Sequence, residues 1–330
     1  MTIRHDWTYP EAYALYQQPL LELLWQAQQV HRAHFLPNTI QVCTLQNIKV
    51  GGCPEDCSWC GQSIHHNTGV KSEPLAPLSE VIAGAKAAKA QGATRYCLAA
   101  SWRKPTKRNL ANVIDMVKAI KATGLQACVT LGKLSVEFAQ ELKTAGLDYY
   151  NHNLETSENH FAKLTTTRTF AERLATLENV RQVGLKVCSG GILGMGETEQ
   201  DRIDLLITLA NQPEHPQSVP INHLVRIEGT PLENAQPVED FAFIRCIALA
   251  RLMIPKAYVR LSGGRVLMSK LMQTLCFVAG ANSIHQGGRK LLVTPNVDIN
   301  LDQALFAELG LQAEANVLAS KTIPMVVNAS

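Results

Sequence analysis

Three closely spaced cysteines are the residues of this sequence best suited to chemistry. Cys53, Cys57 and Cys60 lie in the stretch GGCPEDCSWCGQS (51–63), a C-x3-C-x2-C pattern with no fourth cysteine at similar spacing. Structural metal sites built on cysteine usually take four protein ligands. Whether a fourth ligand exists, or its absence has a purpose, therefore decides what this loop does.

Two kinds of metal site fit the loop. A zinc site would take its fourth ligand from His65 or His66, although structural zinc ligands usually form two close pairs. In a 4Fe–4S cluster, the three thiolates would bind three irons and leave the fourth iron open. An open position is typical of catalytic metals. The spacing matches neither ferredoxin pattern. Trp59, between the last two cysteines, either covers a planar ligand beside the metal or packs the loop.

A second set of cysteines shares a common depth in the predicted strands. Cys128 and Cys188 each stand four residues after a glycine, and Cys97 stands five after one. Equivalent positions on neighbouring barrel strands meet in the interior, so these thiols are predicted to converge. The alternative is that each is a small buried apolar residue. Cys43, Cys246 and Cys276 lack this relation, and we interpret them as structural.

Strand-like and helix-like segments alternate along the chain from residue 39. Each predicted strand is followed by an amphipathic segment, and several of these segments end at a glycine, as helices often do. The predicted strands are 39–50, 95–101, 126–132, 148–155, 186–192, 218–225, 258–264 and 281–285. The alternation predicts a parallel sheet with crossover helices.

About eight such units predict a (β/α)8 TIM-type barrel, with a doubly wound open sheet as the alternative. We expect an N-terminal helical extension over 1–38, the barrel over 39–310 and a weakly patterned C-terminal tail over 311–330. The cysteine loop follows the first predicted strand. It is therefore expected at the carboxyl end of the barrel, where active sites collect.

The composition limits the possible classes of function. The 330 residues carry 31 Lys and Arg against 28 Asp and Glu, which gives no reason to expect nucleic acid or an anionic membrane as a partner. The apolar segment 241–254 is too short to span a bilayer and is predicted to be a buried helix. The first residues contain no apolar signal core, so we expect a cytoplasmic protein. In that compartment, nine cysteines favour metal binding or catalysis over disulfides.

With the motifs identified, the sequence resembles the radical S-adenosylmethionine superfamily and, within it, the biotin synthase family. The resemblance extends over nearly the whole chain. The segments that carry it are GGCPEDCSWCGQS, YYNHNLETS, TTTRTFAERL, KVCSGGILGMGET, SVPINHLVRIEGTPL, YVRLSGGR and GANSI with KLLVTPN. It implies that Cys53, Cys57 and Cys60 hold a 4Fe–4S cluster whose open iron binds S-adenosylmethionine.

The resemblance also implies a second cluster and a reaction. Cys97, Cys128, Cys188 and Arg260 match the ligands of an interior 2Fe–2S cluster, and the role of Arg260 comes from the resemblance alone. The implied reaction inserts sulfur from this cluster into dethiobiotin and forms biotin. Two S-adenosylmethionine molecules are cleaved reductively for each product, and their 5′-deoxyadenosyl radicals break the two C–H bonds.

Ligand contacts are implied in the same way. Trp59, Asn153, Glu155, Arg173 and Ile192 correspond to S-adenosylmethionine contacts, with Arg173 opposite the methionyl carboxylate. The expected contacts of the dethiobiotin ureido ring are Asn151, Asn153 and Asn222. Amide side chains suit a neutral urea because each offers a donor and an acceptor.

The sequence departs from the family pattern at two places. Position 155 is Glu where the family has Asp, and the extra methylene moves the carboxylate outward by ~1.5 Å. The last barrel loop reads SIHQGGRKLLVT, where an aromatic is expected after SI. His285, Gln286 and Arg289 therefore either reshape the mouth of the pocket or lie in solvent. Cys43 stands at a position where the family usually has Ser.

Further expectations follow from the family. They are a flavodoxin- or ferredoxin-type reductant, iron–sulfur assembly proteins as partners and a homodimer. Two alternatives stay open: another radical S-adenosylmethionine enzyme on the same barrel, such as a maturase, and a non-catalytic iron–sulfur module. The interior set of three cysteines and Arg260 distinguishes the first alternative from the main hypothesis.

Overall fold

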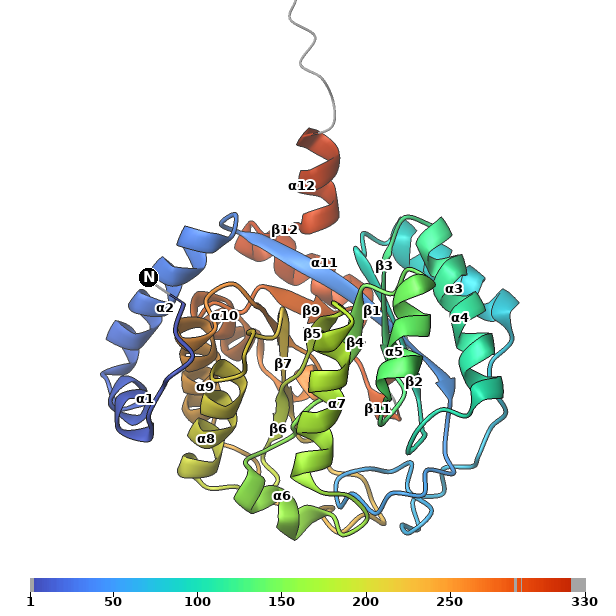
Figure 1. Cartoon of the computed structure of the whole chain (residues 1–330). Coiled ribbons are helices and arrows are strands. Elements are labelled where there is room, and N and C mark those ends of the chain that lie inside the picture. The colour runs from blue at the N-terminus through green and yellow to red at the C-terminus, as the bar shows by residue number, and fades with distance from the viewer. Residues whose placement is uncertain (1–2, 288–289, 292, 322–330) are drawn as a thin grey trace, which may run out of the picture.

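The computed structural model describes residues 3–287, 290–291 and 293–321. Its central parallel strands are β1 (Thr39–Lys49), β2 (Arg95–Ala100), β3 (Gln126–Thr130), β4 (Tyr149–Asn151), β5 (Lys186–Cys188), β7 (Ser218–His223), β8 (Tyr258–Leu261) and β9 (Ser283–His285). β1 pairs with β2 on one side and with β9 on the other, which closes the sheet (Figure 1). The closure confirms the predicted (β/α)8 barrel and excludes the open sheet.

Helices surround the barrel and connect its strands (Figure 1). They are α3 (Leu78–Ala90), α4 (Lys107–Ala122), α5 (Val136–Thr144), α6 (Glu158–Leu164), α7 (Phe170–Gln182), α8 (Glu199–Ala210), α9 (Asp240–Met253), the 3-10 helix η1 (Arg265–Leu267), α10 (Lys270–Val278) and α11 (Ile299–Leu309). Several begin at Ser or Thr caps, such as Thr106 of α4 and Thr169 of α7, which satisfy free N–H groups of the first turn.

The predicted strand over 186–192 is split. β5 ends at Cys188, and β6 (Gly191–Leu193) continues along β7. Gly190 and Gly191 connect the two because a side chain would not fit: a Cβ would lie 1.9 Å from Pro220 O at Gly190 and 2.4 Å from Glu155 O at Gly191. These glycines therefore allow close approach to the protein's own backbone.

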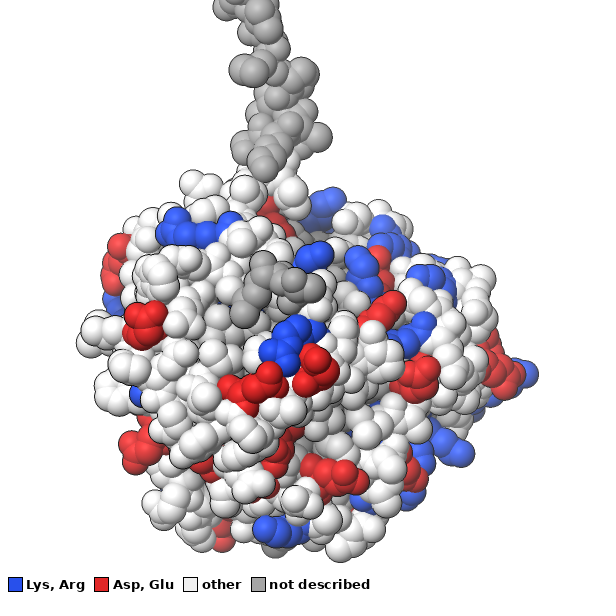
Figure 2. Space-filling view, turned by 60° about the vertical axis from the view of Figure 1, so that its left-hand side comes forward, with Lys and Arg blue, Asp and Glu red and all other residues white. Residues whose placement is uncertain are grey.

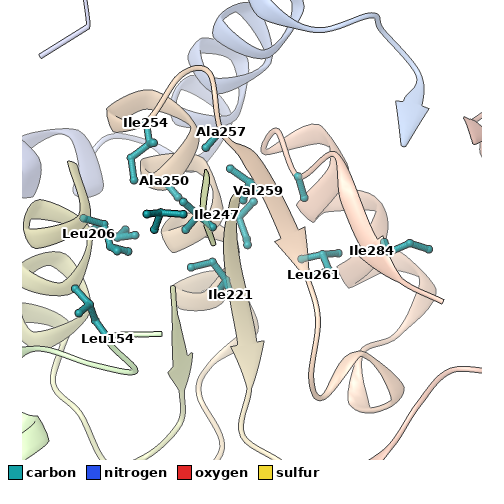
Figure 3. Packing of buried hydrophobic residues seen from close by; sticks show 14 of the residues in the cluster. Leu154, Leu206, Ile221, Ile247, Ala250, Ile254, Ala257, Val259, Leu261 and Ile284 are labelled. Carbon is teal, nitrogen blue, oxygen red and sulfur yellow. The ribbon is translucent and has the colours of Figure 1, made fainter. Parts of the chain in front are cut away.

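The apolar core lies between the barrel wall and the helices. Figure 3 shows Ile221 of β7 and Val259 of β8 near Ile247 of α9, all of them buried. The segment 241–254 forms most of α9, as predicted, and ten residues of this helix are buried. Outward-facing strand residues thus form this core, which leaves the inward-facing residues available for a site.

The residues before β1 form α1 (Tyr9–Tyr16) and α2 (Leu20–His34). Leu23, Leu24 and Ala27 of α2 are buried, and the two helices fall within the helical extension expected over 1–38. Figure 1 shows both helices beside α8, α9 and α10. The extension thus covers one side of the helical ring.

Structure also continues after Gly310, where the weak pattern made no prediction. The short strand β12 (Gln312–Ala313) pairs with the start of β1 through Thr39 and Ile40, and α12 (Glu314–Lys321) follows. A separate hairpin joins β10 (Lys290–Leu291) and β11 (Thr294–Pro295). Figure 1 places α12 at the end of the barrel opposite the loop that follows β1.

The surface carries both signs of charge. On the face in Figure 2, Lys and Arg alternate with Asp and Glu, and neither sign dominates. Within the described part of the chain, no helix has the length and apolar character needed to cross a membrane.

Candidate active site

The cysteine loop leaves β1 at the carboxyl end of the barrel, where it was predicted (Figure 1). Its turn is tight: Cys53 forms an isolated bridge with Ser63, and Cys60 N donates to Cys57 O at 3.0 Å. Cys53 and Cys57 are buried and Cys60 is partly exposed. The Cys60 sulfur itself is buried, which raises its pKa to about 12, so a thiolate there requires nearby positive charge such as iron.

The two acidic residues inside the motif anchor the loop to residues 165–168. Asp56 accepts hydrogen bonds from Thr165 Oγ1 at 2.6 Å and from Thr166 N at 3.0 Å. Glu55, 1% exposed, pairs with Arg103 at 3.5 Å and Arg168 at 3.9 Å. The threonine–arginine segment thus fixes the cysteine loop in place.

Arg168 also touches the motif directly, because its Nη2 donates to the Cys57 sulfur. The sequence reasoning missed Glu55, Asp56 and Arg168 as site residues. The signal was present, since CPEDC and TTTR stood among the segments that carried the resemblance.

His65 and His66 are turned toward backbone carbonyls. His65 Nε2 lies 3.2 Å from Pro54 O, and His66 Nε2 lies 2.9 Å from Cys57 O. Each ring thus already has a backbone carbonyl as its partner. Among the described residues, no three His, Cys, Asp or Glu side chains are close enough to hold a single metal ion. In a cubane cluster, by contrast, each thiolate binds its own iron.

The depth-matched cysteines converge in the barrel interior. Cys97 of β2 and Cys128 of β3 are directly registered neighbours, and with Cys188 and Tyr149 they form one buried cluster. The side chain of Cys128 lowers the pKa of Cys97 well below its usual value. The convergence that the strand positions predicted is therefore present, whatever the thiols bind.

Arg260 lies beside this cluster and is 1% exposed. Its Nη1 is 3.7 Å from Cys188 Sγ, and its Nε donates to Ser283 Oγ at 3.0 Å. A second buried guanidinium, Arg95, lies over the Tyr149 ring at 3.4 Å from the centroid. Both Nη atoms of Arg95 lack hydrogen-bond partners among the described residues.

Arg95 was missed by the sequence reasoning, although a signal existed. It stands two residues before Cys97 in RYC, so the alternation of strand side chains directs both to the same face. Two cations therefore border the interior thiols, which suits the negative charge of an iron–sulfur cluster held by thiolates.

Cys43 differs from the other cysteines that were interpreted as structural. Cys246 and Cys276 lie in the main apolar core, whereas Cys43 is registered with Arg95. Its sulfur lies 3.4 Å from Gln41 Oε1 and 3.8 Å from Ser283 Oγ. Cys43 therefore belongs to the polar network that holds Arg260.

A single cavity joins the loop to the interior. Its lining includes Cys60 from the loop, Cys97, Cys128 and Arg260 from the interior, and Trp59, Asn151, Asn153, Glu155, Ile192 and Asn222 between them. Trp59 and Ile192 pack against the same small apolar cluster at its wall. Trp59 therefore packs the loop and also lines the cavity, and its contact with a planar ligand stays a prediction.

Hydrogen bonds hold each of the three asparagines, and Asn153 accepts from Gly190 N at 3.3 Å. Asn151 accepts from Thr130 Oγ1 at 2.9 Å and donates to Cys188 Sγ at 3.2 Å. Asn222 donates to Gly191 O and accepts from Gly263 N, both at 2.8 Å. Such anchoring pre-arranges amide groups before a ligand binds.

Glu155 and Arg173 form a pair at the edge of the cavity. Glu155 adopts a left-handed backbone, φ 72°, and its Oε1 lies 3.6 Å from Arg173 Nη2. Arg173 lies behind the cavity lining and donates to the backbone O of Asn153. Burial lowers its pKa to about 10. Arg173 thus contacts two residues that line the cavity, but its own side chain does not line it.

The altered last loop contributes His285, Val293 and Thr294 to the cavity. His285 lines it and is 6% exposed, and Gln286 is also buried, so neither side chain lies in solvent. Arg289 falls outside the described residues.

Relatives of this chain carry a common name. It is 53% identical to a biotin synthase from Marinobacter nauticus over 94% of this chain and 88% of that protein. It is 55% identical to one from Pseudomonas syringae pv. syringae over 95% of this chain and 89% of that protein. The chain belongs to the biotin synthase family.

Two domain families agree with this, and a solved structure shares the fold. Residues 47–209 match the Radical SAM superfamily, and residues 220–312 match the Biotin and Thiamin Synthesis associated domain. The crystal structure of a methylornithine synthase superposes with a TM-score of 0.80 at 19% identity, over 95% of this chain and 96% of that one. That likeness concerns the fold alone. As a member of the biotin synthase family, the chain is a radical S-adenosylmethionine enzyme that transfers sulfur.

Proposed function

We propose that this enzyme converts dethiobiotin to biotin with two iron–sulfur clusters that have different tasks. The supporting observation is the shared cavity, which Cys60 lines at one end and Cys97, Cys128 and Arg260 line at the other. A substrate in this cavity would lie between the two cysteine sets. A non-catalytic iron–sulfur module has no need of such a space.

The donor sets fit the two clusters. Cys53, Cys57 and Cys60 would hold a 4Fe–4S cluster, and the three interior cysteines with Arg260 would hold a 2Fe–2S cluster. When bound, the first supplies one electron to each of two S-adenosylmethionine molecules, and the second supplies the sulfur. The interior donor set lacks a fourth thiolate, which is the usual ligand, and this suits a cluster that gives up an atom.

The chain's own residues bind and orient the substrate in this proposal. Asn151, Asn153 and Asn222 would face the ureido ring, whose N–H and C=O groups match the two halves of an amide. The Asn151 amide already contacts Cys188 Sγ at 3.2 Å. It would therefore connect the substrate's position to that of the interior cluster.

S-adenosylmethionine would bind at the loop end of the cavity. Trp59 and Ile192 would pack against its adenosyl group, and Glu155 with Asn153 would meet the ribose hydroxyls. Arg173 was expected opposite the methionyl carboxylate, which stays a prediction. Its contacts with Asn153 O and Glu155 also favour a positioning role for Arg173 behind them.

The remaining family properties are part of the same proposal. They are a flavodoxin- or ferredoxin-type reductant, iron–sulfur assembly proteins, a homodimer and a cytoplasmic location. Nucleic acid is not among the proposed partners, because the face in Figure 2 carries mixed charge without a basic patch.

Anaerobic reconstitution followed by assay tests the proposal. With dethiobiotin, S-adenosylmethionine and a flavodoxin-type reductant, the enzyme is expected to form biotin and deoxyadenosine. Deoxyadenosine without biotin would favour a different radical S-adenosylmethionine enzyme, such as a maturase. Zinc in place of iron at the loop cysteines would contradict the proposal outright.

A further inference from the structure

His285 is a buried polar residue that faces the interior thiols. Its strand, β9, closes the barrel: Ser283 is registered with Arg260 of β8, and His285 with Cys43 of β1. Side chains two residues apart on a strand share a face. His285 therefore points into the barrel, one step nearer the carboxyl end than Ser283, and lines the cavity together with Cys97.

The two ring nitrogens of His285 have different surroundings. Nδ1 lies 2.7 Å from Ser262 Oγ. Nε2 is buried and has no hydrogen-bond partner among the described residues. A buried polar atom left unpaired costs free energy, so Nε2 is expected to gain a partner when the site is complete.

The Cys97 sulfur is the neighbour that suits Nε2. Both side chains are buried, and both line the same cavity. The thiol is thus a sulfur that shares the space into which the unpaired Nε2 opens. A thiolate bound to iron keeps its negative charge and is a better acceptor than a thiol.

The backbone of His285 is held firmly at this place. Arg265 Nη2 donates to His285 O at 3.1 Å. The same guanidinium forms a buried ion pair with Asp302 at 2.7 Å and a hydrogen bond with Gln273 at 2.8 Å. Anchoring of this kind fixes the direction of a ring that must reach one particular atom.

We propose that His285 is a positioning residue of the interior cluster, and that its Nε2–H donates a hydrogen bond to the Cys97 sulfur. The Ser262 hydroxyl donates to Nδ1, which keeps the ring proton on Nε2. The inference rests on the proposed function, because it assigns Cys97 to a 2Fe–2S cluster. Hydrogen bonds to cluster sulfurs stabilise the reduced, more negative state and raise the reduction potential.

This arrangement bears on sulfur transfer. If the interior cluster gives up sulfur to a carbon radical, its irons would take up one electron for each C–S bond formed. A hydrogen bond that stabilises the reduced cluster favours that step. His285 stands where an aromatic residue is expected, so the effect is a property of this chain.

Three variants test the inference. His285→Leu removes the donor, and His285→Gln keeps an N–H near the position of Nε2. Ser262→Ala removes the hydroxyl that holds Nδ1, so that the ring proton can lie on either nitrogen. Each holoenzyme is reconstituted anaerobically, its iron and sulfide are counted, and the 2Fe–2S potential is measured by optical redox titration. Resonance Raman spectroscopy records the Fe–S stretching bands. The 4Fe–4S signals serve as the internal control for folding.

The expected result is a lower 2Fe–2S potential and higher Fe–S stretching frequencies in His285→Leu. His285→Gln should restore part of both shifts, and Ser262→Ala should give a smaller shift in the direction of His285→Leu. Equal potentials in all four proteins would overturn the inference and leave the proposed function standing. Pulsed EPR of the 15N-labelled reduced enzyme tests a second outcome. If the wild type shows a histidine nitrogen bound directly to iron and His285→Leu lacks it, His285 is a ligand and the inference is overturned. Absence of a 2Fe–2S cluster from the wild type would instead refute the proposed function.

Discussion

The guanidinium of Arg260 lies 3.7 Å from the Cys188 sulfur inside the barrel. Burial alone lowers the pKa of Arg260, but the neighbouring Cys43 and Cys188 outweigh this effect, and the net pKa is raised. The arginine therefore keeps its proton beside the thiols. A protonated guanidinium has no free lone pair, so iron must displace that proton if Arg260 is to be a ligand.

Replacing Cys188 should separate the two clusters. Cys188→Ser is expected to lose the 2Fe–2S cluster, roughly one third of the bound iron, because the interior set loses one of its thiolates. The 4Fe–4S signal and reductive formation of deoxyadenosine should persist, while biotin is not formed. Iron analysis, Mössbauer spectroscopy and product assay check this. An unchanged 2Fe–2S signal would remove Cys188 from the ligand set.

The complementary change is in the loop. Cys57→Ser should lose the 4Fe–4S cluster, roughly two thirds of the iron, together with deoxyadenosine formation. The interior 2Fe–2S signal should remain, because its ligands lie on other strands. Deoxyadenosine formation at the wild-type rate would show that Cys57 does not hold the cluster that cleaves S-adenosylmethionine.

The Glu155–Arg173 pair should matter for both binding and stability. Arg173 is 4% exposed and stays charged at neutral pH. Glu155→Gln removes its ion-pair partner. A loss of about 3 kcal/mol of stability is expected. The Kd of S-adenosylmethionine should rise about tenfold, equivalent to about 1.4 kcal/mol. Denaturant unfolding and equilibrium dialysis measure the two effects, with Glu155→Asp as the charge-retaining control. Equal values for Glu155→Gln and wild type would rule out this role.

The attachment of the cysteine loop should depend on pH through Asp56. Burial alone would raise the pKa of Asp56, but hydrogen bonds from Thr165, Thr166 and Thr167 hold it well below its usual value. A lowered carboxylate pKa contributes stability that is complete above about pH 4 and lost as pH falls toward the folded pKa. The stability difference between wild type and Asp56→Asn should therefore shrink below about pH 4. Urea unfolding of both apoproteins across that range measures it, and a constant difference would contradict the prediction.

Arg251 should be a structural anchor at the far end of the barrel. It is fully buried in α9 and donates to Pro255 O at 2.8 Å, Ala257 O at 2.9 Å and Gly280 O at 2.9 Å. Arg251→Leu leaves these carbonyls unpaired and should cost about 3 kcal/mol. The exposed Arg32→Leu change is the matched control, expected within about 0.5 kcal/mol of wild type. Similar unfolding midpoints for both variants would refute the anchor role.

Much of the fold followed from local pattern. The barrel could be predicted because strand-like and helix-like segments alternate along the chain and several of the helical segments end at a glycine. The convergence of Cys97, Cys128 and Cys188 could be predicted because barrel strands bring equivalent positions together. The split after Cys188 could not, because it depends on the approach of Gly190 to Pro220, which lies on another strand.

The site was harder to predict where it depends on contacts between distant segments. Nothing local in CPEDC indicates that Asp56 is held by Thr165, 109 residues away. Nothing local in SIH indicates that His285 reaches Ser262 or that it lines a cavity together with Cys97. Arg95 is the exception, because its spacing of two residues from Cys97 was enough to predict that its side chain points inward.

The central claim is that the interior cluster supplies the sulfur of biotin. It is tested most directly by reconstituting the enzyme with 34S-sulfide, removing free sulfide, and measuring by mass spectrometry the sulfur isotope of biotin formed in a single turnover. Biotin that carries 34S, with loss of the 2Fe–2S absorption in proportion to product, is the result predicted here. Unlabelled biotin, or labelled cluster that survives product formation unchanged, would contradict it.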